Sequence, residues 1–371
     1  MYWAGTGRGL ARCRRGKKAC LRPIPMSAAS SSVETVFVRG SIMLGCLLLY
    51  LATPLPAPPG PPITSRRYAV STAKLLGLHS SLPPPSVRAA AAGLARSFVQ
   101  SRRDDTTDRF LVACNVTSWT GRLGKSVRGT LSILLQRLSW SRTDANALVQ
   151  RFSLFVASRS QLVALLQGAS VGAPPQTLLD IGAGTGAMTT VLASALGLSP
   201  SHVTGLEDSA PLRRRLAARG YRAVASLAEA SSSRYDAIAL LNVLDSCDEP
   251  QALLRGAAGV LSADGVILLE SVVPFCPRVY KGAWGVVDAH RPPRSPLGIS
   301  AAFRCRGVKH GPAQGKSFEG VAAGFVAGAV EGLDLEVVAW TRLPYISSGD
   351  EWASHVVLDS ALFVLRRRRT S

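Results

Sequence analysis

The chain has 371 residues, of which 47% are hydrophobic and 18% charged, so it can bury a substantial core and is not disordered throughout. Its seven cysteines include no Cys-x-x-Cys pair and its five histidines show no metal-ligand spacing, so no disulfide scaffold and no metal site are predicted. No run of 18 uncharged apolar residues occurs, which excludes a polytopic membrane protein.

The formal net charge of +20 is concentrated at the ends of the sequence and in one insertion. Residues 1–40 carry eight Lys or Arg against one acidic residue, residues 291–316 carry six against none, and Arg366 to Arg369 add four. By contrast, residues 174–290 carry nine basic and eleven acidic residues. Because the best-patterned part of the chain is not basic, we expect no nucleic-acid partner.

Residues 1–55 are predicted to form a basic targeting segment. An apolar run from Ser41 to Leu55 follows Arg39, and its length fits a signal sequence or a short anchor better than a full membrane span. Through this run the chain could associate with a membrane. An Arg-rich, acid-poor lead is also typical of a mitochondrial presequence, and translation could start at Met1, Met26 or Met43. The compartment therefore stays open on these residues alone.

Two further segments precede the best-patterned region. Residues 56–108 are rich in Pro, Ser, Ala and Arg, which predicts a linker with at most one short helix within residues 87–100. Residues 109–170 show helical apolar spacing and are expected to form a helical cap. The triplet Asn115-Val116-Thr117 is an N-glycosylation sequon, which matters only if the chain enters the secretory lumen.

From residue 171 to residue 371 apolar strands alternate with helices, which predicts an α/β domain with a mostly parallel sheet covered on both faces. No helical pattern separates the last two strands, so the last strand is expected to run antiparallel at one edge. The seven expected strands are 177–184, 202–208, 221–226, 235–245, 265–273, 335–343 and 360–367, and the expected helices are 187–196, 210–220, 250–261 and 317–331.

The strongest motif is the turn from Asp180 to Gly186, which follows the first strand and opens a helix. Glycines at 182 and 184, with Ala183 between them, permit positive φ and let a ligand approach the backbone. Glu207 ends the second strand, where a carboxylate can accept both hydroxyls of a ribose. Dinucleotides and S-adenosyl-L-methionine both fit this pattern. The position of Asp180 before the glycines favours S-adenosyl-L-methionine, because a carboxylate there repels a pyrophosphate and attracts an ammonium group.

Candidate reaction residues follow the fourth and sixth strands. Asn242 and Asp245 come where the fourth strand ends, and ligands of open α/β sheets bind outside these carboxyl ends. Asp245 and Asp248 could also merely cap the next helix. Pro344 is expected to force an extended turn that presents Tyr345 at the same rim, although a core position for this tyrosine is equally consistent with its chemistry.

Five segments in this order and spacing carry a more specific resemblance: LLDIGAGTG, YDAIALLNVLDSCDEP, VVPFCPRVY, WTRLPY and VLDSALFVL. Together they resemble the DREV family of methyltransferases, the protein-histidine N-pros (Nπ) methyltransferases, over roughly residues 109–367. The resemblance implies a class I, Rossmann-like, seven-stranded methyltransferase fold that uses S-adenosyl-L-methionine. It implies protein substrates with alternating His-x-His motifs, x being small, and residence in the endoplasmic reticulum or in mitochondria.

The resemblance also assigns site residues. Asp180, Gly182, Gly184 and Glu207 match the family's cofactor positions, and Asn242, Asp245 and Tyr345 match its histidine pocket. Ser226 stands where the family has an Asn near the adenine, so that contact is in doubt. The basic insertion at residues 291–316 is longer than the family pattern. Our hypothesis for catalysis is that Asp245 accepts a hydrogen bond from the distal ring N–H, while Asn242 and Tyr345 fix the ring plane.

Other functions remain open at this point. A small-molecule methyltransferase would have the same fold, and a non-catalytic cofactor-binding scaffold could retain it. Intact Asp180, Glu207, Asn242 and Asp245 argue against the scaffold. A nucleic-acid methyltransferase would place basic residues around the crevice, and no Asn-Pro-Pro-aromatic motif follows the fourth strand.

Overall fold

The computed structural model describes residues 63–64, 92–115, 118–138, 142–151, 153–277, 279–283, 286–291, 318–348 and 355–368. All of them belong to one unit of the chain, Pro58–Ser371. The expected targeting segment at residues 1–55, and all of the basic insertion at 291–316 except Arg291, lie outside the described residues. No helix in the described part of the chain is long and apolar enough to cross a membrane.

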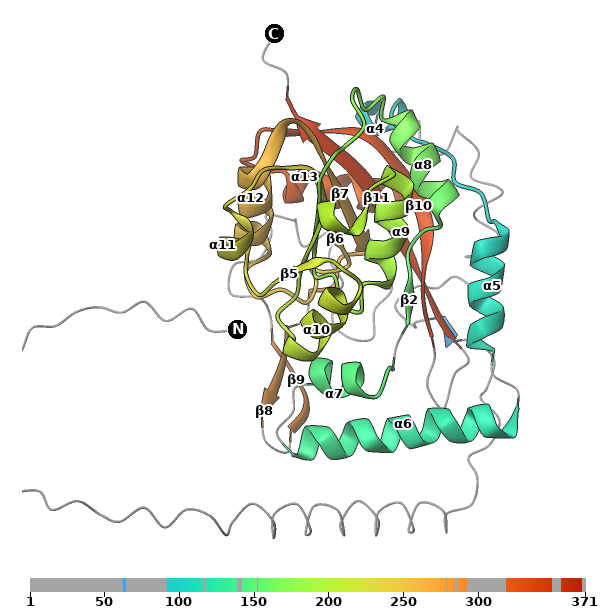
Figure 1. Ribbon diagram of the computed structural model, residues 1–371. Coiled ribbons are helices and arrows are strands. Elements are labelled where there is room, and N and C mark those ends of the chain that lie inside the picture. The colour runs from blue at the N-terminus through green and yellow to red at the C-terminus, as the bar shows by residue number, and fades with distance from the viewer. Residues whose placement is uncertain are drawn as a thin grey trace, which may run out of the picture. The chain divides into compact units, whose positions relative to one another are not determined.

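A nine-stranded mixed sheet forms the centre of this unit (Figure 1). Its main path runs β2-β10-β11-β7-β6-β3-β4-β5, and β1 pairs with β11 beside this path. Its members are β1 (Ile63–Thr64), β2 (Leu154–Phe155), β3 (Leu178–Ile181), β4 (Val203–Leu206), β5 (Arg222–Val224), β6 (Tyr235–Leu241), β7 (Leu261–Val272), β10 (Leu335–Ser348) and β11 (His355–Arg367). A separate hairpin joins β8 (Val279–Ala283) to β9 (Val286–Arg291).

The sheet confirms the predicted α/β architecture. Strands β3 to β7 pair in parallel, whereas β11 is antiparallel to both β7 and β10. The seven strands expected from the sequence correspond to β3 to β7, β10 and β11. The short strands β1 and β2 were not predicted, because two residues carry no alternating pattern. Since β2 pairs with β10, the β10–β11 pair is not the outermost edge of the sheet.

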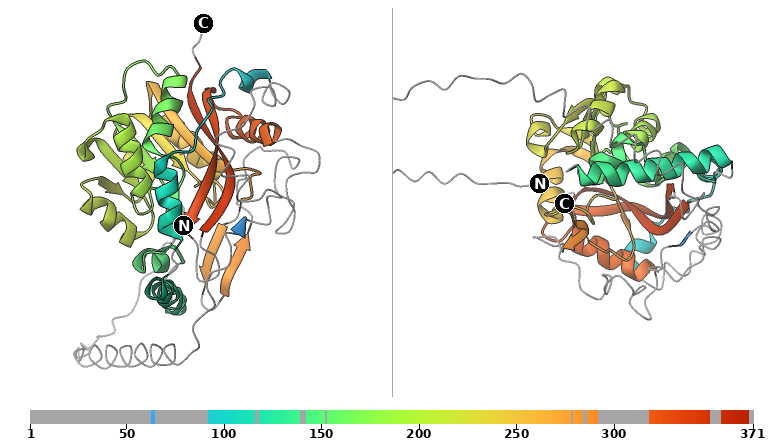
Figure 2. Two further views of the ribbon diagram at one scale, coloured as in Figure 1. Left: turned by 90° about the vertical axis from the view of Figure 1, so that its right-hand side faces the viewer. Right: turned by 90° about the horizontal axis from the view of Figure 1, so that it is seen from below.

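Helices cover both faces of the sheet (Figures 1 and 2). Apolar residues of α11, α12 and α13 pack on one face, and those of α8, α9 and α10 pack on the other. The helices are α4 (Ala92–Ala95), α5 (Asp105–Cys114), α6 (Trp119–Arg137), α7 (Arg142–Leu148), α8 (Arg159–Gly168), α9 (Ala187–Leu196), α10 (Ala210–Ala218), α11 (Leu227–Ala230), α12 (Pro250–Val260) and α13 (Phe318–Ala329), with a 3-10 turn at Pro200–His202.

The segment before α5 is packed against the sheet. Residues 92–104 fall within the linker expected from composition, yet they contact the fully buried Trp340 of β10. The Trp340 indole N–H donates to the Leu94 carbonyl at 2.8 Å, and the Phe98 ring meets the Trp340 ring edge-on with centroids 4.9 Å apart. Two backbone hydrogen bonds join Ser97 and Val99 to the same tryptophan. The polar, Pro-rich composition of 56–108 concealed this contact because its partner lies far away in the sequence.

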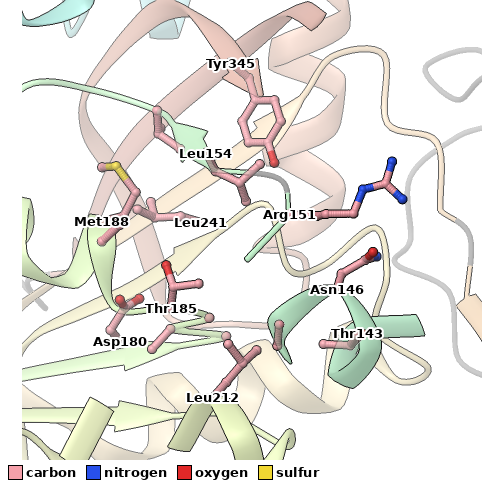
Figure 3. Close-up of a pocket in the computed structure, with 16 residues that line it drawn as sticks. Thr143, Asn146, Arg151, Leu154, Asp180, Thr185, Met188, Leu212, Leu241 and Tyr345 are labelled. Atoms are coloured by element: carbon pink, nitrogen blue, oxygen red, sulfur yellow. The ribbon is translucent and has the colours of Figure 1, made fainter. Parts of the chain in front are cut away.

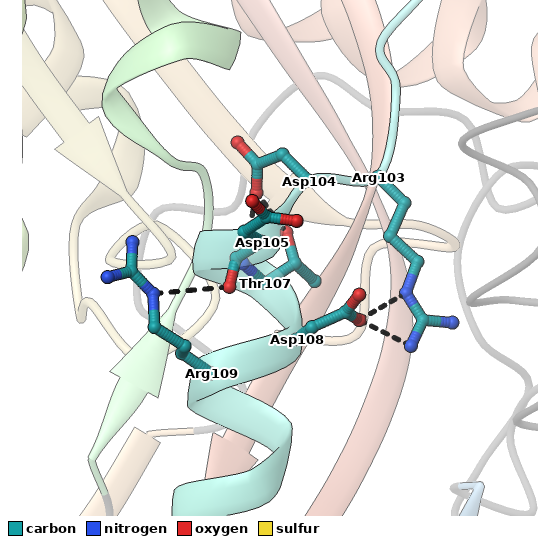
Figure 4. A network of polar contacts seen from close by, with 6 residues as sticks. All are labelled: Arg103, Asp104, Asp105, Thr107, Asp108 and Arg109. Atoms are coloured by element: carbon teal, nitrogen blue, oxygen red, sulfur yellow. Dashed lines mark hydrogen bonds and ion pairs between the residues drawn. The ribbon is translucent and has the colours of Figure 1, made fainter.

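Asp104 joins this segment to two helices, and Figure 4 shows its contact with Thr107 at the start of α5. As the N-cap of α5, its Oδ1 accepts hydrogen bonds from the Thr107 amide at 3.0 Å and the Thr107 hydroxyl at 2.9 Å. Its Oδ2 accepts from Ser158 at 2.5 Å and from Ser160 at 2.7 Å, at the start of α8. Burial alone would raise the pKa of Asp104, but these hydrogen bonds outweigh burial and lower the pKa to about 2. One carboxylate therefore anchors the starts of α5 and α8.

Candidate functional site

A pocket of about 260 Å³ opens at the carboxyl end of the parallel strands (Figure 3). Its wall combines the Gly-rich turn after β3, the start of α9, Leu241 at the end of β6 and Tyr345 of β10. The other side comes from the N-terminal helical segment, which contributes Thr143, Asn146 and Ala147 of α7 together with Arg151, Leu154 and Val156. The pocket therefore lies where ligands of open α/β sheets bind, and α7 and β2 cover it.

The turn after β3 has the backbone geometry that its glycines were expected to allow. Gly182, Gly184 and Gly186 have φ of 76°, 57° and 77°. A Cβ at position 182 would lie 2.9 Å from Val243 Cγ2. The Gly182 and Ala183 amides donate to the Leu206 carbonyl, so they hold the turn against β4 rather than face a ligand. The free N–H groups of the first turn of α9 are then the backbone donors available at this wall.

Asp180 lies at the pocket wall near the end of β3 and is 3% exposed. The Thr189 hydroxyl of α9 donates to its Oδ2 at 2.6 Å. Burial raises the pKa of Asp180 to about 6, although the Thr189 hydrogen bond opposes this shift. A cation placed in the pocket would favour the ionised carboxylate, so this residue suits the ammonium group of a methionine moiety.

Glu207 follows β4 directly and is held rigidly. Its two carboxyl oxygens accept hydrogen bonds from the Gly184 amide at 2.9 Å and from the Ser209 amide at 3.0 Å. Burial raises the pKa of Glu207, and the neighbouring Asp208 adds to this effect. Glu207 does not belong to the residues that line the pocket, but it bonds Gly184, which does. A carboxylate fixed in this way keeps lone pairs that can accept ribose hydroxyls.

Ser226 is not brought to the pocket in the described structure. It is the N-cap of α11, where its hydroxyl accepts from the Glu229 amide at 3.4 Å and lies 3.3 Å from Glu229 Oε1. These hydrogen bonds engage the Ser226 hydroxyl within its own helix. The described structure therefore gives no support for a contact between Ser226 and the adenine, at the position where the family has an Asn.

Asn242, directly after β6, and Tyr345 of β10 are joined by a side-chain hydrogen bond. The Asn242 amide Nδ2 donates to the Tyr345 hydroxyl at 3.0 Å, although 103 positions separate the two residues. Asn242 has a φ of 52°, in the left-handed region that asparagine tolerates better than most residues. Tyr345 is 6% exposed and lines the pocket, so it is both a packed residue and a wall residue.

Asp245 lies beside this pair. Burial raises the pKa of Tyr345 well above its usual range, and the nearby Glu270 and Asp245 carboxyls add to the shift. Helix α12 begins at Pro250 with Glu249 as its N-cap. Neither Asp245 nor Asp248 is therefore the N-cap of α12, which was the alternative role considered for them from the sequence.

Pro344 does not create the expected turn. Strand β10 runs without interruption from Leu335 to Ser348, and Pro344 pairs with Asp359 of β11. Tyr345 reaches the pocket because side chains alternate along this strand. The proline is tolerated because a strand near the sheet edge can leave one amide position without a ladder hydrogen bond.

Sequence reasoning missed several pocket residues. Thr143, Asn146 and Arg151 come from the helical segment, whose position over the site no local pattern predicts. Glu270 was also missed. It is a fully buried carboxyl on β7 that interacts with both Asp245 and Tyr345. A single acid inside the apolar run of residues 265–273 was the available signal.

A Gly-rich turn between a central strand and a helix, with a carboxylate ending the next strand, defines an α/β domain that binds a nucleoside-containing cofactor. The model of the family described as DREV methyltransferase matches residues 88–367, which is more than half of the chain. The chain belongs to this methyltransferase family. The pocket, with Asp180 and Glu207 on either side of the turn, fits S-adenosyl-L-methionine as the methyl donor.

Three solved structures are similar to parts of this chain at low sequence identity. The sugar N-methyltransferase KedS8 from Streptoalloteichus sp ATCC 53650 is 17% identical over 30% of this chain and 47% of its own, with a TM-score of 0.26. The N-terminal domain of EvdMO1 with SAH bound is 19% identical over 57% and 82%, with a TM-score of 0.31. A SAM-dependent methyltransferase from Geobacter sulfurreducens in complex with S-adenosyl-L-homocysteine is 12% identical over 56% and 91%, with a TM-score of 0.33. This chain spans about half the length of the first of these proteins.

Proposed function

We propose that this methyltransferase methylates the Nπ atom of histidine in proteins, at His-x-His motifs in which x is small. The observation that carries the proposal is the hydrogen bond from Asn242 to Tyr345, with Asp245 beside it; Tyr345 lines the cofactor pocket, whereas Asn242 and Asp245 are not among its lining residues. These three groups offer an amide, a hydroxyl and a carboxylate to one flat polar ring. They are also the residues that the DREV resemblance assigns to a histidine pocket.

A neutral imidazole has one nitrogen with a lone pair and one N–H. Its pKa lies near 6.5, so the neutral form predominates at physiological pH. In our proposal, the Asp245 carboxylate accepts the Nτ–H hydrogen bond. The ring is then fixed in the tautomer whose Nπ lone pair is available, and Asn242 and Tyr345 hold its plane.

S-adenosyl-L-methionine, when bound, supplies a methyl group on a sulfonium sulfur, which needs no further activation. The histidine forms the new Nπ–C bond as the C–S bond breaks, and the ring becomes an imidazolium. Asp245 stabilises this cation through the same Nτ–H bond. Loss of the Nτ proton to solvent then gives neutral methylhistidine. The chain therefore contributes chiefly alignment and one negative charge.

Two peptides test the proposal with the full-length chain and S-adenosyl-L-methionine carrying a labelled methyl group. One peptide contains Ala-His-Ala-His-Ala, and the other has both histidines replaced by glutamine. The proposal predicts label in the histidine peptide alone. Label in neither peptide, with cofactor binding confirmed by calorimetry, would contradict histidine as the acceptor while leaving the methyltransferase assignment intact.

We also propose that the chain works in the lumen of the endoplasmic reticulum rather than in mitochondria. Cys276 is disulfide-bonded, and disulfides persist in oxidising compartments. Asn115 of the sequon is exposed at the end of α5. Glycosidase treatment of the chain from cells should change its mobility on gels, and Asn115→Gln should abolish that change. An unglycosylated chain that co-purifies with mitochondria would overturn this location.

A further inference from the structure

Glu270 is a buried acid for which the mechanism above gives no role. It lies on β7, is 0% exposed, and pairs in register with Leu241 of β6 and Leu362 of β11. Next on the same face of β7 comes Val272, which packs with Tyr345 in one apolar cluster. Glu270 therefore lies under the wall that carries the acceptor residues.

Three polar atoms are left without partners at this place. Both carboxyl oxygens of Glu270 and the side-chain oxygen of Asn242 are buried and have no hydrogen-bond partner among the described residues. The two residues are already joined through the backbone, since the Asn242 amide donates to the Glu270 carbonyl at 3.2 Å. Unpaired buried polar atoms are rare and destabilising, so a cluster of three calls for an explanation.

A proton on the Glu270 carboxyl explains how these three buried polar atoms are accommodated. Burial, with a smaller contribution from the nearby Asp245 carboxyl, raises the pKa of Glu270 to about 8 although Ser360 and the Asn242 backbone amide oppose the shift, so Glu270 carries a proton at neutral pH. Among the described residues, the other groups near the Glu270 carboxyl are the Tyr345 hydroxyl, the Asn242 backbone amide and the Ser360 hydroxyl, and neither of the last two makes a hydrogen bond of good geometry to it: the Asn242 amide donates to the Glu270 carbonyl and the Ser360 hydroxyl to the Leu343 carbonyl. None of these groups is a cation. A protonated carboxyl is a donor, and the Asn242 side-chain oxygen is an unused acceptor.

We propose that Glu270 is a positioning residue of the acceptor pocket, which donates its carboxyl O–H to Asn242 Oδ1. This bond fixes the orientation of the Asn242 amide, so that Nδ2 points at Tyr345. It also leaves Asp245 as the single anion beside the acceptor ring. The inference rests on the proposed function and assigns a further residue to the same site.

A neutral Glu270 matters for the chemistry of a histidine acceptor. Two carboxylates next to the ring would favour the imidazolium form, which has no lone pair to accept a methyl group. One carboxylate provides the hydrogen bond to Nτ–H without this excess negative charge. The pocket is thereby matched to a neutral ring with one N–H, and above the pKa of Glu270 the donor to Asn242 is lost.

The first test observes the contact without any substrate. In the full-length chain, the side-chain amide signals of Asn242 are recorded by ¹⁵N NMR as a function of pH, assigned by their loss in Asn242→Ser. We expect them to shift as Glu270 titrates near pH 8, and to stay constant over that range in Glu270→Gln. Signals that do not respond to pH in the wild type would overturn the inference, whatever the acceptor is.

The second test separates positioning from packing. Glu270→Leu keeps the volume and removes the donor, so kcat should fall about tenfold, with cofactor affinity unchanged. Glu270→Gln retains a donor and should restore most of this loss, and its kcat should no longer decline above about pH 8. Glu319→Gln alters another buried glutamate, which pairs with Arg342, and should leave the pH profile of kcat unchanged.

The outcomes distinguish the two proposals. A wild-type kcat and pH profile in Glu270→Leu would overturn the positioning role, and so would a Glu270→Gln variant as impaired as Glu270→Leu. No transfer to any histidine peptide by the wild type would instead contradict the proposed acceptor. In that case the NMR titration still decides whether Glu270 holds Asn242.

Discussion

The side-chain amide of Asn242 donates a hydrogen bond to the Tyr345 hydroxyl at 3.0 Å, and this bond joins the residue after β6 to a residue near the carboxyl end of β10. Strands β7 and β11 lie between them in the sheet. The bond therefore spans the carboxyl ends of the strands where the acceptor is expected. It leaves the Tyr345 hydroxyl proton available to the acceptor ring or to a neighbouring carboxylate.

Loss of the Tyr345 hydroxyl should impair methyl transfer but not cofactor binding. We expect Tyr345→Phe to reduce kcat with a histidine peptide about tenfold, the effect of one lost hydrogen bond in a buried site. Tyr235→Phe is a matched control, because that tyrosine is equally buried but packs on the opposite face of the sheet. A Tyr345→Phe variant with wild-type kcat would remove this residue from the acceptor pocket.

Cofactor affinity should depend on the ionisation of Asp180. The pKa of this carboxyl is raised to about 6, and the ionised form attracts the cofactor's ammonium group. Affinity should therefore rise between pH 5 and pH 7, and calorimetry can measure it. Asp180→Asn should bind about tenfold more weakly at pH 7 and lose this pH dependence. Asp264→Asn, at an exposed position, is the control. The same pH dependence of cofactor affinity in both variants would contradict the role of Asp180 in cofactor binding.

The same shift predicts an effect on the stability of the cofactor-free chain. Because the pKa of Asp180 is raised on folding, the folded state holds this proton more tightly than the unfolded state. The contribution is present below pH 3.8 and is lost as the pH rises through about 6. Denaturant unfolding of Asp180→Asn should lack this component, and a parallel pH dependence in both chains would show that Asp180 does not titrate in this range.

Replacement of Asp104 should destabilise the N-terminal attachment. Asp104→Ala removes the N-cap of α5 and the acceptor of Ser158, so the free energy of unfolding should fall by about 1–2 kcal/mol. Its pKa is lowered to about 2, so this contribution is present above pH 3.8 and lost as the pH falls through about 2. Asp105→Ala, at an exposed position, should cost much less. Equal losses in the two variants would contradict the anchoring role.

Helix α7 should contribute to cofactor retention. Ser209 lies two residues after Glu207, and its hydroxyl donates to Asp144 of α7 at 2.5 Å. Helix α7 also lines the pocket. Asp144→Ala should weaken cofactor binding about three- to tenfold, with little change in global stability. The dissociation rate of the cofactor, followed by stopped-flow fluorescence, should rise in proportion. An unchanged dissociation rate would show that the contact between Asp144 and Ser209 does not help to retain the cofactor.

Much of the fold could be predicted because local signals agreed with each other. The apolar strands, the helical spacing between them and the glycines of the turn all indicated α/β alternation, and helix α9 spans the predicted residues Ala187–Leu196. The prediction that Asp180 and Glu207 bind the cofactor rests on their place at the ends of β3 and β4. The structure adds that Glu207 is bonded to Gly184, which makes the turn and the carboxylate one unit.

Features that depend on distant contacts could not be predicted. The segment around Leu94 and Phe98 packs on Trp340 although its composition resembles a linker. Helix α7 covers a pocket whose Gly-rich turn lies more than 30 residues later in the sequence. Pro344 stays within a strand because its neighbours in the sheet tolerate the missing amide. Glu270 was not singled out from the sequence, because its position beside Asn242 and Asp245 arises only from the pairing of distant strands.

The central claim is that Asp245, Asn242 and Tyr345 present the Nπ atom of a histidine to the methyl donor. The most direct measurement maps the label on the imidazole ring by NMR of the product peptide, for the wild type and for Asp245→Asn. We predict methylation at Nπ in the wild type, and a loss of turnover of about a thousandfold in Asp245→Asn with cofactor affinity retained. Label at Nτ, or wild-type turnover in Asp245→Asn, would contradict this account.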